Sequence, residues 1–279
     1  MPSLQEGETP VLNALPIRRW LALLYFPFFS LAAIFAFSQP GRAQPGRARF
    51  GARDNSAAAP ADALTRPAIV IGFVGGLIRH DDPVHSEVQL AARLRKEYPS
   101  GVDVEVFENR HGEDARKKIL SLLDTDHDGT LSAGEKQNAR IILYGHSWGA
   151  SEIVTLAREL EKEGIPVLLT IQVDSVAKYH QNDAVIPSNV SQAANFYQPD
   201  GLIHGQSTIR AADPARTKII GNFRFEYKTS PYACGDYPWY DRIFTKTHTQ
   251  IECDSKVWTQ VEALIRMNLP PISANGSGQ

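Results

Sequence analysis

Short apolar runs alternate with helical patterns along the chain from Pro67 onward. Ala68–Val74 is almost wholly apolar, which is typical of a strand buried on both faces of a parallel sheet. The other strands are predicted at residues 102–107, 141–144, 167–173 and 217–227. Apolar residues recur at helical spacing in 84–98, 113–123, 150–163 and 257–267. This alternation predicts an α/β fold with a mostly parallel sheet flanked by helices.

Residues 1–66 have a different pattern. Residues 20–37 form an apolar run that follows Arg18 and Arg19. At about 1.5 Å per residue the run suits a signal peptide or a single membrane anchor. Residues 39–66 are rich in Pro, Gly, Ala and Arg, as in a flexible tether. We therefore expect a signal peptide or anchor at 1–38, a tether at 39–66 and one domain at 67–279.

Either interpretation of residues 1–38 places the domain outside the cytoplasm, as an exported protein that is secreted, periplasmic or membrane-anchored. If the segment is not cleaved, it also gives the protein a membrane partner. Four arginines after the apolar run, Arg42, Arg47, Arg49 and Arg53, argue against this orientation by the positive-inside rule. We nevertheless favour export, because the secretion machinery is the first to recognise an apolar N-terminal run that follows an arginine pair.

The charge and the cysteine content bear on the protein's partners and on its redox compartment. Lys+Arg number 29 and Asp+Glu 31, for a net charge of −2, so the overall balance does not call for a nucleic-acid partner. The two cysteines, Cys234 and Cys253, lie close together near the end of the chain. In an oxidising compartment such a pair suggests one disulfide, whereas in the cytosol it would be two unrelated thiols.

The segment Gly145-His146-Ser147-Trp148-Gly149 fits a nucleophile elbow, because it follows a predicted strand and precedes a predicted helix. Small residues two before and two after the serine let the backbone pack tightly at a strained turn. Ser147 is therefore the predicted nucleophile. The alternative is a serine that only caps the helix.

A serine needs a base and an orienting carboxylate, in the chain order Ser, Asp/Glu, His. Asp174 ends the strand at 167–173 and should lie at the same sheet edge as Ser147. Asp183 is a second possibility for the acid. Of the eight histidines, His248 is the predicted base, in a loop before the final helix, with His204 as competitor.

Acyl transfer also needs donors for the developing oxyanion. The backbone N–H of Trp148 follows the nucleophile at the start of a helix and is one predicted donor. An N–H of Gly75 or Gly76, after the first strand, is the other, although these glycines also suit a simple turn.

Residues 124–135 match the twelve-residue loop of an EF-hand at each diagnostic position. The loop has acids at positions 1, 3 and 5, glycine at 6 and glutamate at 12. The predicted calcium ligands are Asp124, Asp126, Asp128, Thr130 through its carbonyl, Ser132 and Glu135. Only about seven residues separate Glu135 from the next strand, room for one or two helical turns. We therefore expect a structural Ca²⁺ rather than a switch.

His80, Asp81, Asp82 and His85 form another polar group. Their spacing matches no zinc pattern, so the sequence assigns no metal there and predicts a polar loop leading into a helix. A Rossmann cofactor domain is also disfavoured, because residues 72–76 lack the third glycine of the fingerprint.

Through residues 145–149, Asp174 and His248, the chain resembles the α/β-hydrolase superfamily, over about residues 67–269. Val173-Asp174-Ser175-Val176, followed by Asn195-Phe196-Tyr197-Gln198 and Gly201, is similar to lipase-like members in which the aspartate is the triad acid. The usual leading antiparallel strands are missing, which implies a reduced sheet of five or six strands.

The resemblance implies a lipase- or esterase-like serine hydrolase acting on a small-molecule ester, a thioester or a lipid-like substrate. Ser147 would attack, His248 would act as base and then acid, and Asp174 would orient His248. The alternative is a non-catalytic calcium-binding domain that keeps the hydrolase shape as a binding or scaffolding module. The substrate itself depends on loops at 181–206 and 229–247, which the sequence does not resolve.

Overall fold

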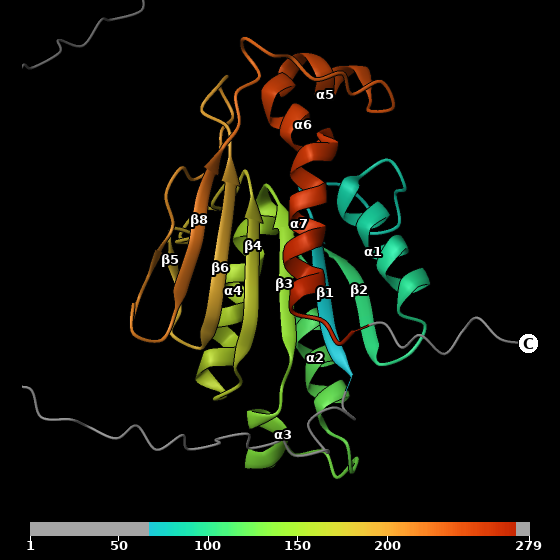
Figure 1. Cartoon of the computed structure of the whole chain (residues 1–279), viewed down its shortest axis with the longest axis vertical. Coiled ribbons are helices and arrows are strands. Elements are labelled where there is room, and N and C mark those ends of the chain that lie inside the picture. The colour runs from blue at the N-terminus through green and yellow to red at the C-terminus, as the bar shows by residue number, and fades with distance from the viewer. Residues whose placement is uncertain (1–66, 272–279) are drawn as a thin grey trace, which may run out of the picture. The chain divides into compact units, whose positions relative to one another are not determined.

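The computed structural model describes residues 67–271, in which six parallel strands form one sheet in the order β2-β1-β3-β4-β6-β8 (Figure 1). The strands are β1 Ala68–Val74, β2 Val102–Glu108, β3 Ile141–His146, β4 Val167–Val173, β6 Val190–Tyr197 and β8 Lys218–Arg224. Two short strands, β5 Val185–Ile186 and β7 Arg210–Ala211, pair separately. The predicted parallel α/β sheet is confirmed.

Helices cover both faces of the sheet. The helices are α1 Ser86–Glu97, α2 Gly112–Leu123, α3 Ala133–Gln137, α4 Trp148–Lys162, α5 Trp239–Phe244, α6 Lys246–Cys253 and α7 Ser255–Met267. α1 and α7 lie on the face toward the viewer in Figure 1, and α2 and α4 lie behind the sheet. The predicted N-cap of the last helix is confirmed, because the Asp254 side chain accepts a hydrogen bond from the Lys256 N–H.

Each face of the sheet has its own hydrophobic core, because successive side chains of a strand point to opposite faces. Val70 and Ile142 pack with the apolar stripes of α1 and α7, including Leu94 and Val261. Neighbouring residues of the same strands pack against α2 and α4 on the other face. Burial on both faces explains why the central strands are almost wholly apolar in sequence.

The main difference from the sequence prediction is β6. Residues 181–206 were expected to be loop, yet Val190–Tyr197 forms an internal strand between β4 and β8. Its sequence, VSQAANFY, contains polar residues that hide the strand pattern. Buried Asn195 is tolerated because its Nδ2 donates to Gln206 O and to Asn222 Oδ1.

The second difference lies before the closing helix, where a loop was expected. This segment contains α5 and α6, which lie over the carboxyl ends of the strands, at the top of Figure 1. His248 is therefore on a helix and not in a loop. α3 lies beyond the opposite end of the sheet, and its five residues match the short exit expected after the calcium loop.

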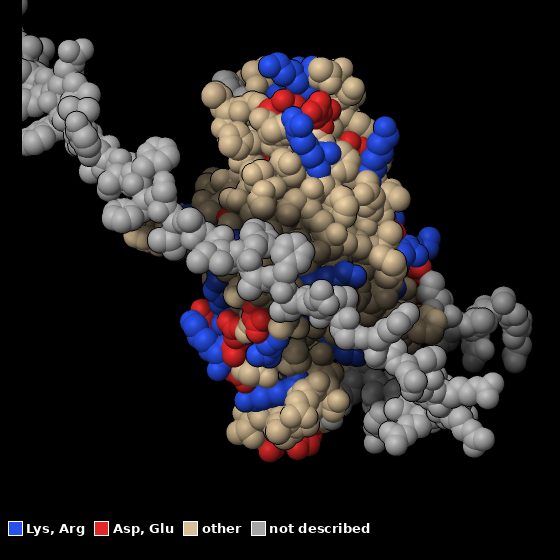
Figure 2. Space-filling view, turned by 60° about the vertical axis from the view of Figure 1, so that its left-hand side comes forward, with Lys and Arg blue, Asp and Glu red and all other residues tan. Residues whose placement is uncertain are grey.

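The predicted signal peptide or anchor at 1–38 and the tether at 39–66 lie outside the described residues. Within residues 67–271, no helix has the length and apolar character needed to cross a bilayer. Figure 2 shows one face of the described part, where side chains of both charge signs lie close together in the same areas.

Candidate active site

The register of the central strands brings Ser147 and Asp174 to the same sheet edge. His146, the last residue of β3, pairs with Val173, the last residue of β4. The next residue of each strand therefore leaves the sheet at its carboxyl end beside the other. The Ser147 N–H donates to Val173 O, which fixes the nucleophile turn against β4.

Ser147 has the backbone conformation of a strained turn, with φ 56° and ψ −125°. A residue other than glycine rarely adopts such a positive φ unless the surrounding structure holds it there. Ser147 occupies the N-cap position of α4, but its side chain makes no capping hydrogen bond. The alternative of a serine that only caps the helix therefore does not fit the structure.

The glycines that flank Ser147 allow this turn. A Cβ added to Gly149 would lie 2.3 Å from Phe73 O, and one added to Gly145 would lie 2.7 Å from the Gly149 carbonyl carbon. Both distances are far below a normal contact. Backbone of β1, the turn and α4 therefore meet at a separation that only glycine permits, as the sequence pattern predicts.

Asp174 is fully buried and its carboxylate is saturated with hydrogen bonds. Oδ1 accepts from the N–H groups of Gln198 and Gly205, at 3.2 and 2.8 Å. Oδ2 accepts from Gln198 Nε2 at 2.8 Å and lies 2.7 Å from His248 Nδ1. These donors compensate for the lost hydration and hold the carboxylate in one orientation. No separate role was predicted for Gln198 or Gly205 from the sequence.

His248 joins the acid to the serine. Its Nε2 lies 2.8 Å from Ser147 Oγ, and its Nδ1 faces Asp174. Because a carboxylate only accepts hydrogen bonds, Nδ1 carries the proton. Nε2 is then the acceptor for the Ser147 hydroxyl. The structure thus brings together the three residues predicted for the triad.

The competing residues lie elsewhere. Asp183 is buried, and its Oδ2 accepts a hydrogen bond from Ser175 Oγ at 2.6 Å. His204 is exposed to solvent. Neither of these two residues is part of the hydrogen-bonded chain that runs from Ser147 to Asp174.

The residues predicted to donate to an oxyanion lie next to Ser147. Trp148 is the first residue of α4, where a backbone N–H has no partner within the helix. Gly75 approaches so closely that an added Cβ would be 2.9 Å from Ser147 Cβ. Asn109 supports this loop, because its Nδ2 donates to Val74 O and Gly76 O at 3.3 and 2.5 Å. The sequence did not single out Asn109.

A cavity of about 350 Å³ opens at Ser147 and His248. Ile78, Trp148, Val176 and Ile203 give it apolar walls, and Gly75 and Gly76 line it beside the serine. Trp148 and Ile203 are more than a third exposed, so they form part of the rim. The cavity can therefore hold an apolar group against the serine hydroxyl.

His146, which precedes Ser147, is buried beside the triad. Its ring centroid lies 4.5 Å from that of His248. Burial lowers the pKa of His146 to about 4, so the ring is neutral at pH 7. A second positive charge next to the imidazole of His248 is thereby avoided.

The cysteines form a disulfide. Cys234 and Cys253 are joined with a Cα–Cα distance of 5.8 Å and a sequence separation of 19. The closed loop contains α5 and most of α6, including His248. The bridge therefore restrains the helix that carries the predicted base.

The predicted calcium loop has several features of an ion-binding turn. The carboxylates of Asp124, Asp126 and Asp128 offer oxygens within 4.8 Å of one another. Gly129 has φ +83° and its N–H donates to Asp124 Oδ2. Asp124 Oδ1 is buried without a hydrogen-bond partner, so an oxygen is left for a cation. These three residues fit a calcium ion.

Glu135 lies apart from this group of carboxylates. Its Oε1 accepts from the N–H and hydroxyl of Thr125, and its Oε2 from those of Ser132. These hydrogen bonds, from Ser132 and then Thr125, lower the pKa of Glu135 to about 2. Glu135 and Ser132 form the capping box of α3. To bind calcium as predicted, Glu135 and Ser132 would have to give up these hydrogen bonds and coordinate the ion instead.

No protein-family model matches the sequence, and no curated protein matches it. Solved structures with a similar arrangement include an arylesterase, with 12% identity, a TM-score of 0.42 and coverage of 74% of this chain and 76% of that chain. An esterase of Pyrobaculum calidifontis has 12% identity and a TM-score of 0.37, with coverage of 72% and 78%. The RedJ thioesterase of Streptomyces coelicolor has 11% identity and a TM-score of 0.34, with coverage of 70% and 96%. These likenesses are too distant to bear on the activity.

Proposed function

We propose that the protein is a serine hydrolase of the α/β-hydrolase type that cleaves an ester or a thioester. The observation that carries the proposal is the continuous hydrogen-bonded chain from Ser147 through His248 to Asp174, at 2.8 and 2.7 Å. These distances suit a nucleophile, a base and an orienting acid. The strained backbone of Ser147 supports it, because such strain is typical of a nucleophile elbow.

In the proposed reaction, Ser147 Oγ attacks the carbonyl carbon of the substrate while His248 Nε2 takes the hydroxyl proton. The carbonyl oxygen becomes an oxyanion, which the N–H groups of Trp148 and Gly75 or Gly76 stabilise. His248 then gives its proton to the departing alcohol or thiol, leaving an acyl group on Ser147. In the second half, a water molecule deprotonated by His248 attacks the acyl carbon. His248 then returns the proton to Ser147 Oγ as the acid leaves.

The cavity favours small esters or lipid-like esters with an apolar group. Its walls next to Ser147 are formed by Ile78, Val176 and Ile203. Apolar walls bind an acyl chain or an apolar leaving group through the removal of its surface from water.

A calcium ion in the loop at 124–135 is part of the proposal, with a structural role. Its support is the group of three carboxylates and the unpaired oxygen of Asp124. α3, which follows the loop, lies beyond the sheet end opposite α5 and α6 (Figure 1). This distance from the triad favours stabilisation over direct control of the reaction.

We also propose export, on the support of the Cys234–Cys253 disulfide, since disulfides persist in oxidising compartments. The N-terminal apolar run at 20–37 would then act as signal or anchor.

The proposal is tested by turnover of p-nitrophenyl esters and matched thioesters with the calcium-loaded full chain. We expect His248→Gln to reduce kcat by about 10³-fold or more, because it removes the base. His204→Gln, an exposed histidine of the same chain, is the matched control and should keep full activity. Equal activity of His248→Gln and the unchanged protein would refute the proposed role of His248.

A further inference from the structure

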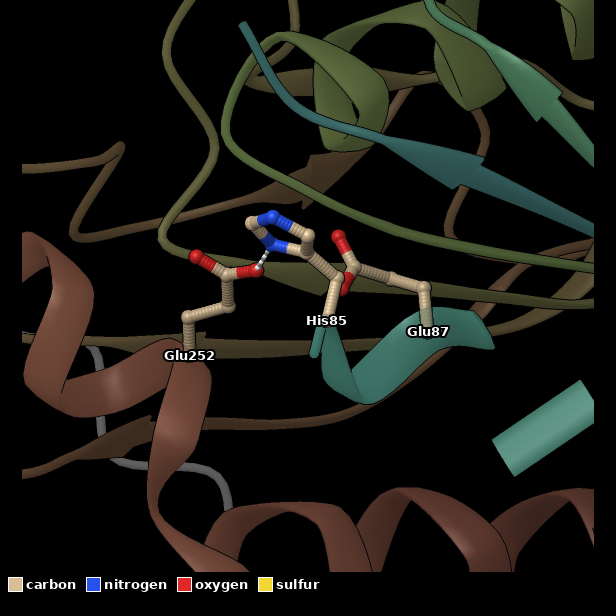
Figure 3. Close-up of side chains that lie close together, drawn as sticks. All are labelled: His85, Glu87 and Glu252. Carbon is tan, nitrogen blue, oxygen red and sulfur yellow. Dashed lines mark hydrogen bonds and ion pairs between the residues drawn. The ribbon is translucent and has the colours of Figure 1, made fainter. Parts of the chain in front are cut away.

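Four buried polar side chains meet at one side of the active-site cavity. Figure 3 shows three of them: His85, just before α1, Glu87 in its first turn, and Glu252 from α6. The fourth is His146, at the end of β3. All four are at most 4% exposed, and His85, His146 and Glu252 also line the cavity. We call these four residues the buried His/Glu cluster.

The atoms of this cluster converge on a small volume. His85, Glu87 and Glu252 each offer one donor atom, and the three atoms lie within 4.8 Å of one another. His85 Nδ1 is 2.5 Å from Glu252 Oε1 (Figure 3). His146 Nδ1 is 3.4 Å from Glu252 Oε2 and 4.0 Å from Glu87 Oε1. Donor atoms around a tetrahedral zinc, each about 2.0–2.1 Å from the ion, are about 3.4 Å apart. Binding an ion here would therefore replace the His85–Glu252 hydrogen bond and move these side chains by a small amount.

Several of these buried polar atoms have no hydrogen-bond partner. Both carboxylate oxygens of Glu87 and both ring nitrogens of His146 are buried with no hydrogen-bond partner. Buried polar groups are hydrogen-bonded in the great majority of cases, so each exception needs an explanation. The unpaired oxygens of Glu87 and the unpaired Nδ1 of His146 face the same point, near Glu252.

A bound cation would also balance the negative charge of the cluster. Two carboxyl groups, those of Glu87 and Glu252, lie together in the interior. Glu252 lies beside the rings of His85 and His146, and Glu87 Oε1 lies 4.0 Å from Nδ1 of His146. One dication with two carboxylates and two neutral imidazoles would make the group neutral.

We propose that the buried His/Glu cluster is a binding site for a zinc-type dication, with His85, Glu87 and Glu252 as its ligands and His146 beside them. Mixed imidazole and carboxylate donors suit Zn²⁺ and neighbouring transition metals, whereas Ca²⁺ and Mg²⁺ prefer oxygen donors only. The site is therefore distinct in ligand chemistry from the calcium loop.

Such an ion would connect the segments that position the triad. Glu252 lies one helical turn after His248 on α6, and His146 directly precedes Ser147. Residues four apart on a helix share one face, so a ligand at Glu252 restrains the orientation of His248. The ion thus ties α6 to the start of α1, next to the nucleophile turn, and its role is to position His248.

Metal binding is tested directly, without reference to activity. The full chain is purified without a metal-affinity tag, stripped with a chelator, and titrated with Zn²⁺ in millimolar Ca²⁺, which occupies the loop. We expect one zinc per chain. Glu252→Gln and His85→Asn should weaken zinc binding by about 100-fold or more, because each removes a ligand. His80→Asn, an exposed histidine from the same loop, is the matched control and should not change it.

A second measurement does not depend on whether the variants fold. Co²⁺ added to the stripped, unchanged protein should give the visible ligand-field absorption of a site with nitrogen and oxygen donors, and Zn²⁺ should displace it. Zinc binding that is unaffected in Glu252→Gln and His85→Asn would overturn the proposal. So would the absence of stoichiometric zinc and of the cobalt spectrum, which would mean that Glu87 and Glu252 share a proton instead.

Discussion

At the residue scale, the site depends on three side chains that are far apart in sequence. Ser147 and Asp174 lie side by side because β3 and β4 are neighbours in the sheet and end in register. His248 reaches them from α6, and its two ring nitrogens face Ser147 and Asp174. Asp174 is therefore expected to set the tautomer of His248.

Asp174→Asn tests this role. An asparagine keeps the size of the side chain but lacks the negative charge that favours a proton on Nδ1 of His248. We expect kcat/KM for an activated ester to fall by about 10⁴-fold. The melting temperature should also fall, because an amide NH2 cannot accept the hydrogen bond from Gln198 Nε2. The measurement is steady-state turnover together with thermal unfolding.

Asp183→Asn is the matched control, because Asp183 is also a buried aspartate after β4 and its contact is with Ser175. It should retain nearly all activity. If the two variants lost activity to the same extent, the assignment of Asp174 as the orienting acid would be wrong.

The sequence predicted the residues at strand ends better than those that depend on long-range packing. Ser147 and Asp174 were predicted because each follows an apolar strand. Gln198 and Asn109, which fix Asp174 and the loop after β1, carry no local signal of their roles. Likewise, His85 and Glu252 are 167 residues apart, so their contact follows only from the fold.

At the scale of elements, helices with an apolar periodicity and strands with an apolar run were predicted closely. Elements that lack such a pattern and depend on hydrogen bonds to distant segments were not predicted. The predicted strand at 167–173 coincides with β4. β6 was missed because it contains polar residues whose partners lie in segments distant in sequence, such as Asn195, whose Nδ2 donates to Asn222 Oδ1. α6 was missed because its eight residues lack a clear apolar stripe, with buried His248 and Gln250 among them.

The junction of β1, β3 and α4 is the element-level feature that most constrains the sequence. Gly149→Ala would place a methyl group 2.3 Å from Phe73 O, a backbone atom that cannot move alone. We expect the free energy of unfolding to fall by about 2 kcal/mol or more. Urea unfolding of the variant and the unchanged protein measures this difference.

Gly134→Ala is the matched control for that substitution. Gly134 lies within α3, and an added Cβ would meet only Ser132 Oγ at 4.0 Å. Alanine is favoured over glycine in a helix by about 1 kcal/mol, so stability should stay equal or rise slightly. A loss of stability as large as that of Gly149→Ala would contradict the steric explanation.

At the scale of the whole molecule, the sheet separates two kinds of site. The triad lies at the carboxyl ends of the strands, where Ser147 follows β3, Asp174 follows β4 and α6 supplies His248. α3 lies beyond the other end of the sheet (Figure 1). Calcium in the loop before α3 should therefore change the stability of the fold more than the chemistry at Ser147.

Calcium binding predicts a measurable increase in stability. With free Ca²⁺ at about 100 times the dissociation constant, the folded state should gain about 2.7 kcal/mol, seen as a higher melting temperature. Asp124→Ala, at the first position of the loop, should abolish most of this gain, whereas Asp114→Ala, which changes an exposed aspartate on α2, should not. A melting temperature that does not respond to calcium or its chelation would exclude the proposed site.

The most direct test of the central claim is covalent labelling of the folded, calcium-loaded protein with a fluorophosphonate, followed by peptide mass spectrometry. The account predicts one phosphonate adduct per chain, on Ser147, and none in Ser147→Ala. It also predicts that Ser151→Ala, which removes a buried serine one turn along α4, is still labelled. Folded protein that is not labelled, or is labelled at another residue, would contradict the account and favour a binding module that keeps the hydrolase shape.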